Sequence, residues 1–187
     1  MSKYVIYLRG INVGGKNKIR MADLREKLTD EGFENVQTYI QSGNIVLESE
    51  LGIKTIEGLA ERIIIDNFEI DSTRIKVLAL EYGVYQRIME ETPDHFGSIV
   101  EGIDYRYDVL FPMGISVEEV MKDIQVRENI DTVWHGKHAI YYRRPGPSHP
   151  DYTKSGLSRL AQKAVYQSIT IRNWKTTLKL WEMLNTE

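Results

Sequence analysis

The stretch Gln37-Thr-Tyr-Ile-Gln-Ser-Gly-Asn-Ile-Val-Leu-Glu48 decides the fold class, because it reads as two short β-strands around a tight turn. The turn residues Ser42, Gly43 and Asn44 are typical of a chain reversal. Strands that are joined in this way are antiparallel neighbours in one sheet. A purely parallel sheet is therefore excluded for the first half of the chain.

The elements on either side of this hairpin complete the order β-α-β-β-α-β. Residues 4–8 are apolar at the positions that face either side of a strand, which predicts a central strand that is covered on both faces. Apolar residues at helical spacing predict helices over residues 21–31 and 56–64, and residues 75–80 predict the last strand. This order is that of the ferredoxin-like unit.

The same order of elements recurs in the second half, after a short helix at about residues 82–91. The predicted elements are strands at 105–111, 132–135, 138–142 and 168–171, and helices at 117–124, 155–166 and 173–185. Gly136 suits a type II′ turn between the two hairpin strands. We predict an α+β protein with two ferredoxin-like (βαββαβ) α/β-sandwich halves, residues 1–95 and 103–187, joined by a junction at 96–102.

The composition restricts the class of protein. The chain has 187 residues, of which 42% are hydrophobic and 27% are charged, as in a globular protein with a real core. It contains neither an apolar stretch of about 18 residues nor the apolar region of a signal peptide, so we expect a cytoplasmic protein with no membrane partner. It has no cysteine, which excludes disulfides, thiol nucleophiles, iron–sulfur clusters and thiolate zinc sites.

The formal net charge of −3 is distributed unevenly. Residues 9–20 include four basic residues and no acid, and residues 143–179 include eight basic residues and one acid. Because the rest of the chain is acidic, these segments indicate either an anionic partner at a local patch or solvated surface without a partner. The basic, proline-rich stretch 143–150 has no role that the sequence predicts.

A glycine-rich loop follows the first strand and reads Gly10-Ile-Asn-Val-Gly-Gly-Lys-Asn17. It matches a nucleotide-binding P-loop except at Asn17, where a serine or threonine hydroxyl would hold magnesium. Glycines let main-chain N–H groups approach a ligand closely, and successive N–H groups can form a concave site for an anion. The loop therefore indicates an anion site without P-loop hydrolysis.

This loop and the hairpin turn are predicted to lie together. In a ferredoxin-like unit, the turn between the second and third strands lies where the first strand finishes, so loop 9–20 meets turn 41–44. Lysine and arginine add charge there, while asparagine and glutamine add directional hydrogen bonds. The predicted ligand-binding residues are Arg9, Asn12, Gly14, Gly15, Lys16, Asn17, Lys18, Gln41, Ser42 and Asn44. The alternative is an ordinary surface loop whose glycines serve a turn.

A second candidate anion site lies at the start of the last helix. Thr170 or Asn173 can cap this helix, which leaves its positive N-terminal dipole beside Arg172 and Lys175. Arg172, Asn173 and Lys175 extend the ligand site if the halves dock with these residues beside the loop; otherwise Asn173 only caps the helix. Apolar residues at helical spacing also predict a buried stripe here. It consists of Trp174, Leu178 and Trp181.

We expect the chain to bind a phosphate-bearing small molecule or a nucleotide at loop 9–20 and turn 41–44. One alternative is a nucleic-acid-binding module that uses the basic segments, although the aromatic pattern of RNA-binding sheets is missing. A second alternative is an NTP-hydrolysing or other enzyme, although Asn17, the helix start near residue 21 and the antiparallel hairpin oppose NTP hydrolysis. No catalytic residue, cofactor or oligomeric state is predicted, and two histidines at the second hairpin do not by themselves make a metal site.

Three segments of the chain are specific when they are taken together: Leu8-Arg-Gly-Ile-Asn-Val-Gly-Gly-Lys-Asn-Lys18, Thr38-Tyr-Ile-Gln-Ser-Gly-Asn-Ile45 and Thr170-Ile-Arg-Asn-Trp-Lys-Thr176. They resemble the signature segments of a bacterial family known as domain of unknown function 1697. The resemblance implies two similar α/β units in a cytosolic protein with no assigned activity. The family-typical residues are Arg9, Gly10, Asn12, Gly14, Gly15, Lys16, Gln41, Ser42, Gly43, Asn44, Arg172, Asn173 and Trp174. None of them brings a known catalytic role.

Overall fold

Two antiparallel sheets of four strands each organise the chain, so a mixed α+β fold is confirmed. The structure is a computed structural model, and it describes residues 1–186. Contacts divide the chain into two compact units. Unit 1 consists of Met1–Tyr85 together with the residues from Leu180 onwards, and unit 2 consists of Gln86–Lys179.

Both ends of the chain contribute to unit 1. The chain leaves this unit within helix α3 (Tyr82–Glu90) and returns to it within helix α6 (Trp174–Leu184). The predicted halves, residues 1–95 and 103–187 with a junction at 96–102, follow the repeated order of elements and stay a prediction. They assign all of α6 to the second half, whereas the last turns of this helix make their contacts in unit 1.

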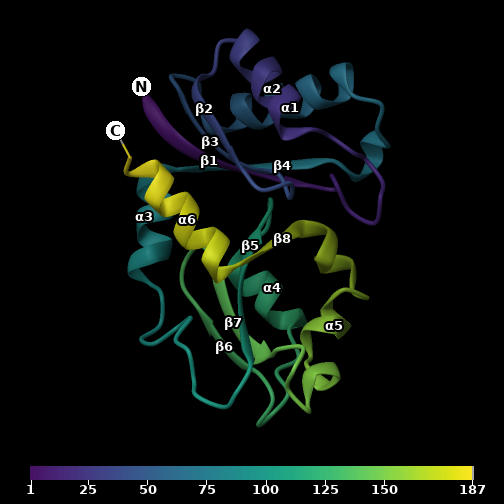
Figure 1. Cartoon of the computed structure of the whole chain (residues 1–187), viewed down its shortest axis with the longest axis vertical. Helices are drawn as coiled ribbons and strands as arrows, with labels where there is room; N and C mark the ends of the chain where they lie inside the picture. Colours follow the sequence, from purple (N-terminus) through teal and green to yellow (C-terminus); the bar gives the residue numbers. More distant parts are fainter. Residues whose placement is uncertain (187) are drawn as a thin grey trace. The chain divides into compact units, whose positions relative to one another are not determined.

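Unit 1 contains the predicted order β-α-β-β-α-β (Figure 1). Its elements are β1 (Ser2–Arg9), α1 (Met21–Asp30), β2 (Glu34–Tyr39), β3 (Asn44–Ser49), α2 (Ile53–Asn67) and β4 (Lys76–Glu81). The strand order is β2-β3-β1-β4, and all neighbouring strands are antiparallel. Helices α1 and α2 pack on one face of the sheet (Figure 1).

Strand β1 lies inside the sheet and is covered on both faces, as its apolar pattern predicts. Tyr4 and Leu8 belong to the core that the sheet forms with α1 and α2. On the other face, the hydroxyl groups of Tyr7 and Tyr85 are hydrogen-bonded at 2.9 Å. Tyr85 in turn stacks with Trp181 of α6, with 6.3 Å between the ring centroids. The end of α6 is therefore part of the packing of unit 1.

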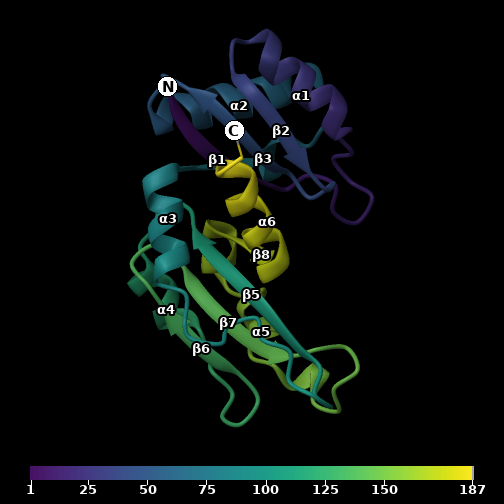
Figure 2. The same cartoon turned by 60° about the vertical axis from the view of Figure 1, so that its left-hand side comes forward.

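Unit 2 has a second sheet with the strand order β6-β7-β5-β8 (Figure 2). Its elements are β5 (Tyr105–Pro112), α4 (Val117–Asp123), β6 (Thr132–His135), β7 (Ile140–Pro145), α5 (Leu157–Leu160) and β8 (Ile169–Asn173). All neighbouring strands are again antiparallel. Leu110, Ile140 and Tyr142 of the sheet share a core with Val120 of α4 and Leu160 of α5. The predicted repeat in the order of strands is confirmed.

The long helix predicted over residues 155–166 is wrong, because α5 has only 4 residues and short 3-10 helices flank it. The buried carboxylate of Asp131 accepts hydrogen bonds from the Ser155 hydroxyl at 2.7 Å and from the Gly156 N–H at 2.8 Å. A Cβ on Gly156 would collide with the main-chain oxygen of Gln125. The Asp131 carboxylate therefore fixes the start of α5, and the helix ends at Leu160.

The type II′ turn predicted at Gly136 is also wrong. Residues 136–139 join β6 to β7, and Gly136 does not have the positive φ that this turn requires. The carboxylate of Glu91 accepts a hydrogen bond from the Lys137 N–H at 2.9 Å, and a Cβ on Gly136 would collide with this carboxylate. Glycine leaves room here for the Glu91 side chain and does not serve the predicted turn type.

The buried stripe of helix α6 differs from the predicted one. Thr177, Leu180 and Leu184 are fully buried, whereas Leu178 is 36% exposed. The two tryptophans of the helix are half-buried, and each contacts aromatic rings of other elements. Spacing alone assigns tryptophan to the core, but here two positions on the buried face are occupied by threonine.

Candidate functional site

The glycine-rich loop after β1 folds as a small hairpin. The N–H of Asn12 donates to the carbonyl of Asn17 at 2.9 Å, and the N–H of Lys16 donates to the carbonyl of Val13 at 3.0 Å. The two glycines at the tip have positive φ values of 58° and 76°, which glycine adopts without strain. Two of the main-chain N–H groups considered for an anion are therefore used within the loop.

Asn12 joins this loop to the turn between β2 and β3. Its side-chain NH₂ group donates to the carbonyls of Ile19 at 3.0 Å and Gln41 at 2.7 Å, and its side-chain oxygen accepts from the Ile19 N–H at 2.8 Å. The N–H of Leu8 donates to the carbonyl of Gly43 at 2.8 Å in the same region. The predicted convergence of loop and turn is confirmed.

Asn17, at the position of the P-loop hydroxyl, has a structural role. It is buried, and its NH₂ group donates to the carbonyls of Gly10 at 2.8 Å and Asp71 at 3.3 Å. Its side-chain oxygen accepts from the Asp71 N–H at 2.8 Å. Helix α1 begins at Met21 and the sheet is antiparallel, so all three features that oppose a P-loop are confirmed.

The turn residues are held in a similar way. Asn44 is fully buried, and its NH₂ group donates to the carbonyl of Tyr39 at 3.1 Å and to the Ser42 hydroxyl at 2.9 Å. Arg9 is half-buried at the end of β1, opposite Lys76 of β4. The side chains of Asn12, Asn17 and Asn44 thus shape the site from within.

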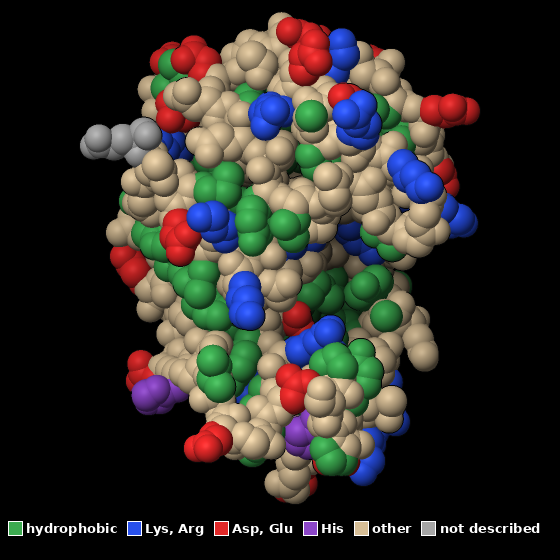
Figure 3. Space-filling model, in the orientation of Figure 1, with side chains coloured by type: hydrophobic (Ala, Val, Ile, Leu, Met, Phe, Trp, Pro, Cys, Tyr) green, Lys and Arg blue, Asp and Glu red, His purple; other side chains and the backbone are tan. Residues whose placement is uncertain are grey.

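A depression of about 330 Å³ lies where loop and turn meet. It is lined by Asn12, Gly15, Lys18, Ile19, Arg20 and Gln41. The side chains of Lys16, Lys18 and Arg20 are exposed, and Figure 3 shows basic side chains (blue) projecting at the edge of unit 1 where Figure 1 shows the purple loop. Arg20 is missing from the predicted ligand residues, although its place in the basic segment was a signal for it.

The acidic side chain of Asp71, next to the loop, already has a hydrogen-bond donor and a basic partner. The Thr73 hydroxyl donates to Asp71 at 2.6 Å, and Nε of Arg74 lies 3.2 Å from the Asp71 carboxylate. The hydrogen bonds from Thr73, together with the charges of Arg74 and Lys16, hold the pKa of this carboxyl below its ordinary value. Part of the negative charge near the loop is thereby balanced locally.

The predicted residues of the third segment lie in unit 2. The side-chain oxygen of Asn173 accepts from the Thr176 N–H at 2.8 Å, so Asn173 caps α6. Arg172 is buried, and its Nη1 donates to the Thr170 hydroxyl and to the Ile171 carbonyl, both at 2.9 Å. Thr170 therefore does not act as the cap. It stays a prediction that a shared ligand site includes Arg172, Asn173 and Lys175.

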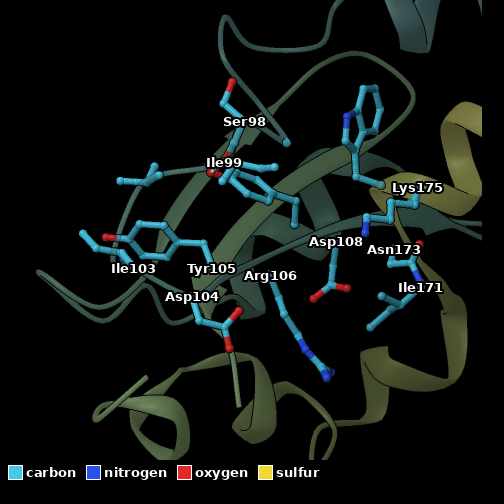
Figure 4. Close-up of a pocket in the computed structure, with 14 residues that line it drawn as sticks. Ser98, Ile99, Ile103, Asp104, Tyr105, Arg106, Asp108, Ile171, Asn173 and Lys175 are labelled. Carbon is cyan, nitrogen blue, oxygen red and sulfur yellow. Dashed lines mark hydrogen bonds between the residues drawn. The ribbon is translucent and has the colours of Figure 1, made fainter. Parts of the chain in front are cut away.

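Unit 2 contains a larger groove (Figure 4). The sequence analysis did not predict it as a whole, although Asn173 and Lys175 of the second candidate anion site line it. It has a volume of about 580 Å³ and is lined by residues 97–100, 103–108, 171 and 173–175. Phe96 packs edge-on against Trp174 and Tyr107, with 5.3 Å and 5.0 Å between ring centroids. The Tyr107 hydroxyl donates to the Ser98 carbonyl at 2.9 Å, and burial raises its pKa.

The basic, proline-rich stretch packs against the start of β5. The guanidinium of Arg143 lies 4.6 Å from the centroid of the Tyr105 ring, and the His149 ring stacks with Tyr105 at 6.0 Å. Asp104 accepts from the Gly146 N–H through its carbonyl and from the Ser148 N–H through its carboxylate, at 2.8 Å and 2.9 Å. This stretch therefore supports one end of the groove.

Residues 1–186 include no helix that is long and apolar enough to cross a membrane. The same residues contain no group of three or more histidine, aspartate or glutamate side chains placed to hold a metal ion.

Comparisons with known proteins agree with the architecture. The chain is similar to the conserved bacterial protein SP0830 from Streptococcus pneumoniae, whose structure has a TM-score of 0.81 and 29% sequence identity to this chain. The match covers 98% of this chain and 99% of that one. No curated protein matches the sequence. Residues 1–141, which include the glycine-rich loop and the Ser-Gly-Asn turn, match the family described as "Protein of unknown function (DUF1697)", and the chain belongs to this family.

Proposed function

We propose that the chain binds a phosphate-bearing small molecule or a nucleotide at the depression of unit 1, without P-loop hydrolysis. The observation that carries the proposal is the depression of about 330 Å³ between the loop and the turn, none of whose lining residues is acidic. Three exposed basic side chains, Lys16, Lys18 and Arg20, belong to the same loop. A local concentration of positive charge on an otherwise acidic chain attracts an anion to this place.

Each part of the loop has a separate task in this proposal. Among the described residues, the N–H groups of Gly14 and Gly15 have no hydrogen-bond partner, and a Cβ on either glycine would meet no atom within 4 Å. Both N–H groups are therefore accessible to a phosphate oxygen. Lys18 and Arg20 supply charge-assisted hydrogen bonds, each worth about 1.5–3 kcal/mol. The buried asparagines keep the loop in shape before a ligand arrives, which reduces the ordering cost of binding.

Isothermal titration with inorganic phosphate and with ATP tests this proposal. We expect saturable binding of at least one of these probes, with no release of phosphate from ATP. The variant Lys16→Ala/Lys18→Ala/Arg20→Ala removes three charges from side chains that do not hold the loop together, so we expect binding about tenfold weaker or more.

The matched control is Arg25→Ala/Lys54→Ala/Arg62→Ala, which removes three exposed cations from α1 and α2 of the same unit. It should bind as the unchanged chain does. Equal binding by both triple variants, or no binding of either probe, would contradict the proposal. A single-stranded oligonucleotide that binds with a steep dependence on salt would instead support the nucleic-acid alternative.

We also infer that each unit is ferredoxin-like. The support is the order β-α-β-β-α-β in unit 1, together with the same arrangement of strands in both sheets, β2-β3-β1-β4 and β6-β7-β5-β8. In unit 2, the connection before β8 is irregular and contains α5 instead of a long second helix.

A further inference from the structure

One edge of strand β5 is unpaired over the first half of its length. Strand β7 pairs with residues 105–110 of β5, whereas β8 pairs only with residues 108–112. Strand β8 ends at Asn173 because this residue caps α6, and the chain turns into the helix at Trp174. Residues 105–107 therefore have a neighbouring strand on one side only.

The main chain of β5 presents free hydrogen-bonding groups on the unpaired side. The carbonyl of Asp104 accepts from Gly146, next to β7, whereas the N–H of Met113 donates to Ser168, next to β8, both at 2.8 Å. Main-chain groups alternate between the two sides of an antiparallel strand. Tyr105 and Tyr107 therefore direct their N–H and C=O groups away from β7. The pairing of Asp108 with Asn173 uses the Tyr107 carbonyl. The N–H and C=O groups of Tyr105 and the N–H of Tyr107 have no partner on that side among the described residues.

Apolar side chains line one side of this edge. Ile99, Val100 and Ile103 belong to the segment before β5 and are 98%, 39% and 40% exposed. Figure 4 shows Ile99 and Ile103 on the same side of the groove as Tyr105. Isoleucine side chains exposed together beside a free strand edge form a surface that gains stability when it is covered.

The charges of the groove favour an acidic partner. Its acids are already engaged, since Asp104 accepts from Ser148 and Asp108 forms an ion pair with Nε of Arg144 at 2.7 Å. Its cations, Arg106 and Lys175, are exposed and have no ionic or hydrogen-bonded partner within residues 1–186. With Asp108 paired to Arg144, the two cations outweigh the one remaining carboxylate, Asp104, so the net charge of the groove is positive.

We propose that the free edge of β5 binds an extended, acidic peptide segment as an additional strand of the second sheet. An extended peptide presents N–H and C=O groups on one side at every second residue, about 7 Å apart, which is the spacing between Tyr105 and Tyr107. Main-chain bonds of this kind provide affinity, while alternate side chains provide specificity. The apolar side chains of the peptide contact Ile99 and Ile103, and its carboxylates meet Arg106 and Lys175.

The probe is a fluorescein-labelled octapeptide of alternating valine and glutamate, titrated into the full chain by fluorescence anisotropy. We expect saturable binding, and binding about tenfold weaker for the peptide of alternating valine and lysine. Amide hydrogen exchange followed by NMR should slow by about tenfold or more at Tyr105 and Tyr107. Two N-methylated peptides, one methylated on the valines and one on the glutamates, should differ, because only one of them lacks the N–H groups that face β5.

The substitutions that test the proposal are placed at exposed residues, so that a loss of binding does not result from a loss of folding. Ile99→Asp, and Arg106→Glu combined with Lys175→Glu, should each weaken binding by about tenfold. Val126→Asp and Arg159→Glu are the controls, because they change exposed residues of unit 2 outside the groove. The proposal is overturned if no binding occurs up to about 1 mM peptide, or if both N-methylated peptides bind equally. It is also overturned if a peptide or a single-stranded oligonucleotide binds while the amides of Tyr105 and Tyr107 stay unprotected.

Discussion

At the scale of single residues, asparagine side chains determine the shape of the glycine-rich loop. Asn12 and Asn17 have φ values of 51° and 48°, in the left-handed region that asparagine tolerates better than most residues. Topology alone predicts that Asn12 lies near Gln41, and this was correct. The inward role of Asn17 was not predictable, because it depends on Asp71, a residue far away in the sequence. Residue type alone does not distinguish a ligand contact from such a bond.

The substitution Asn17→Ser tests this role, because it completes the P-loop signature. We expect no magnesium-dependent hydrolysis of ATP, since α1 begins at Met21 and not beside the loop lysine. The shorter serine side chain cannot reach both Gly10 and Asp71, so the free energy of unfolding should fall by about 1–3 kcal/mol. Urea denaturation and a phosphate-release assay measure the two effects.

The control for this substitution is Asn129→Ser. Asn129 also has a positive φ, 61°, but its side chain is exposed, so this variant should lose less stability than Asn17→Ser. Hydrolysis of ATP by Asn17→Ser would show that the missing hydroxyl alone had prevented a P-loop activity.

At the scale of elements, the hydrophobic pattern is reliable where an element buries a regular face. Strand β1 and helix α1 were predicted within about two residues, because apolar side chains occupy their buried positions in sequence order. The pattern failed around α5, where the buried carboxylate of Asp131 fixes the chain in addition to the core contacts of Leu160. It also did not predict the groove of unit 2, because the free edge depends on β8 ending at Asn173.

We expect Asp131→Ala to unfold the segment around α5 locally. The substitution leaves the Ser155 hydroxyl and the Gly156 N–H, both of them buried, without their acceptor, which costs about 1–3 kcal/mol for each unsatisfied group. Hydrogen exchange of α5 should accelerate before that of β5. Asp94→Ala, at an exposed position of the same unit, should change neither rate. Unchanged exchange in Asp131→Ala would show that other contacts hold this segment.

At the scale of the whole molecule, unit 1 depends on residues from both ends of the chain. The ammonium group of Lys3 donates to the carbonyls of Leu184 at 3.0 Å and Thr186 at 3.1 Å. The rings of Tyr82 and Trp181 lie 5.4 Å apart. The repeated order of elements could not predict this, because it assigns α6 to the second half as one piece.

Two substitutions in α6 should therefore affect different units. Leu184→Ala removes a fully buried side chain and should destabilise unit 1 by about 2–5 kcal/mol. Leu178→Ala changes a side chain that is 36% exposed in unit 2 and should have a small effect. Hydrogen exchange measured by mass spectrometry should show faster exchange of β1 in Leu184→Ala, with β7 unchanged. Equal acceleration in β1 and β7 would contradict the assignment of the helix end to unit 1.

The discontinuity of unit 1 also has a consequence for protein synthesis. Gln86–Lys179 form one continuous segment of the chain, so unit 2 needs no residue from elsewhere in the chain to fold. The first sheet must wait for Leu180, Trp181 and Leu184, a delay of roughly 5–20 s at ordinary elongation rates. During this interval the ring of Tyr85 lacks the stacking contact that Trp181 makes with it in the finished fold.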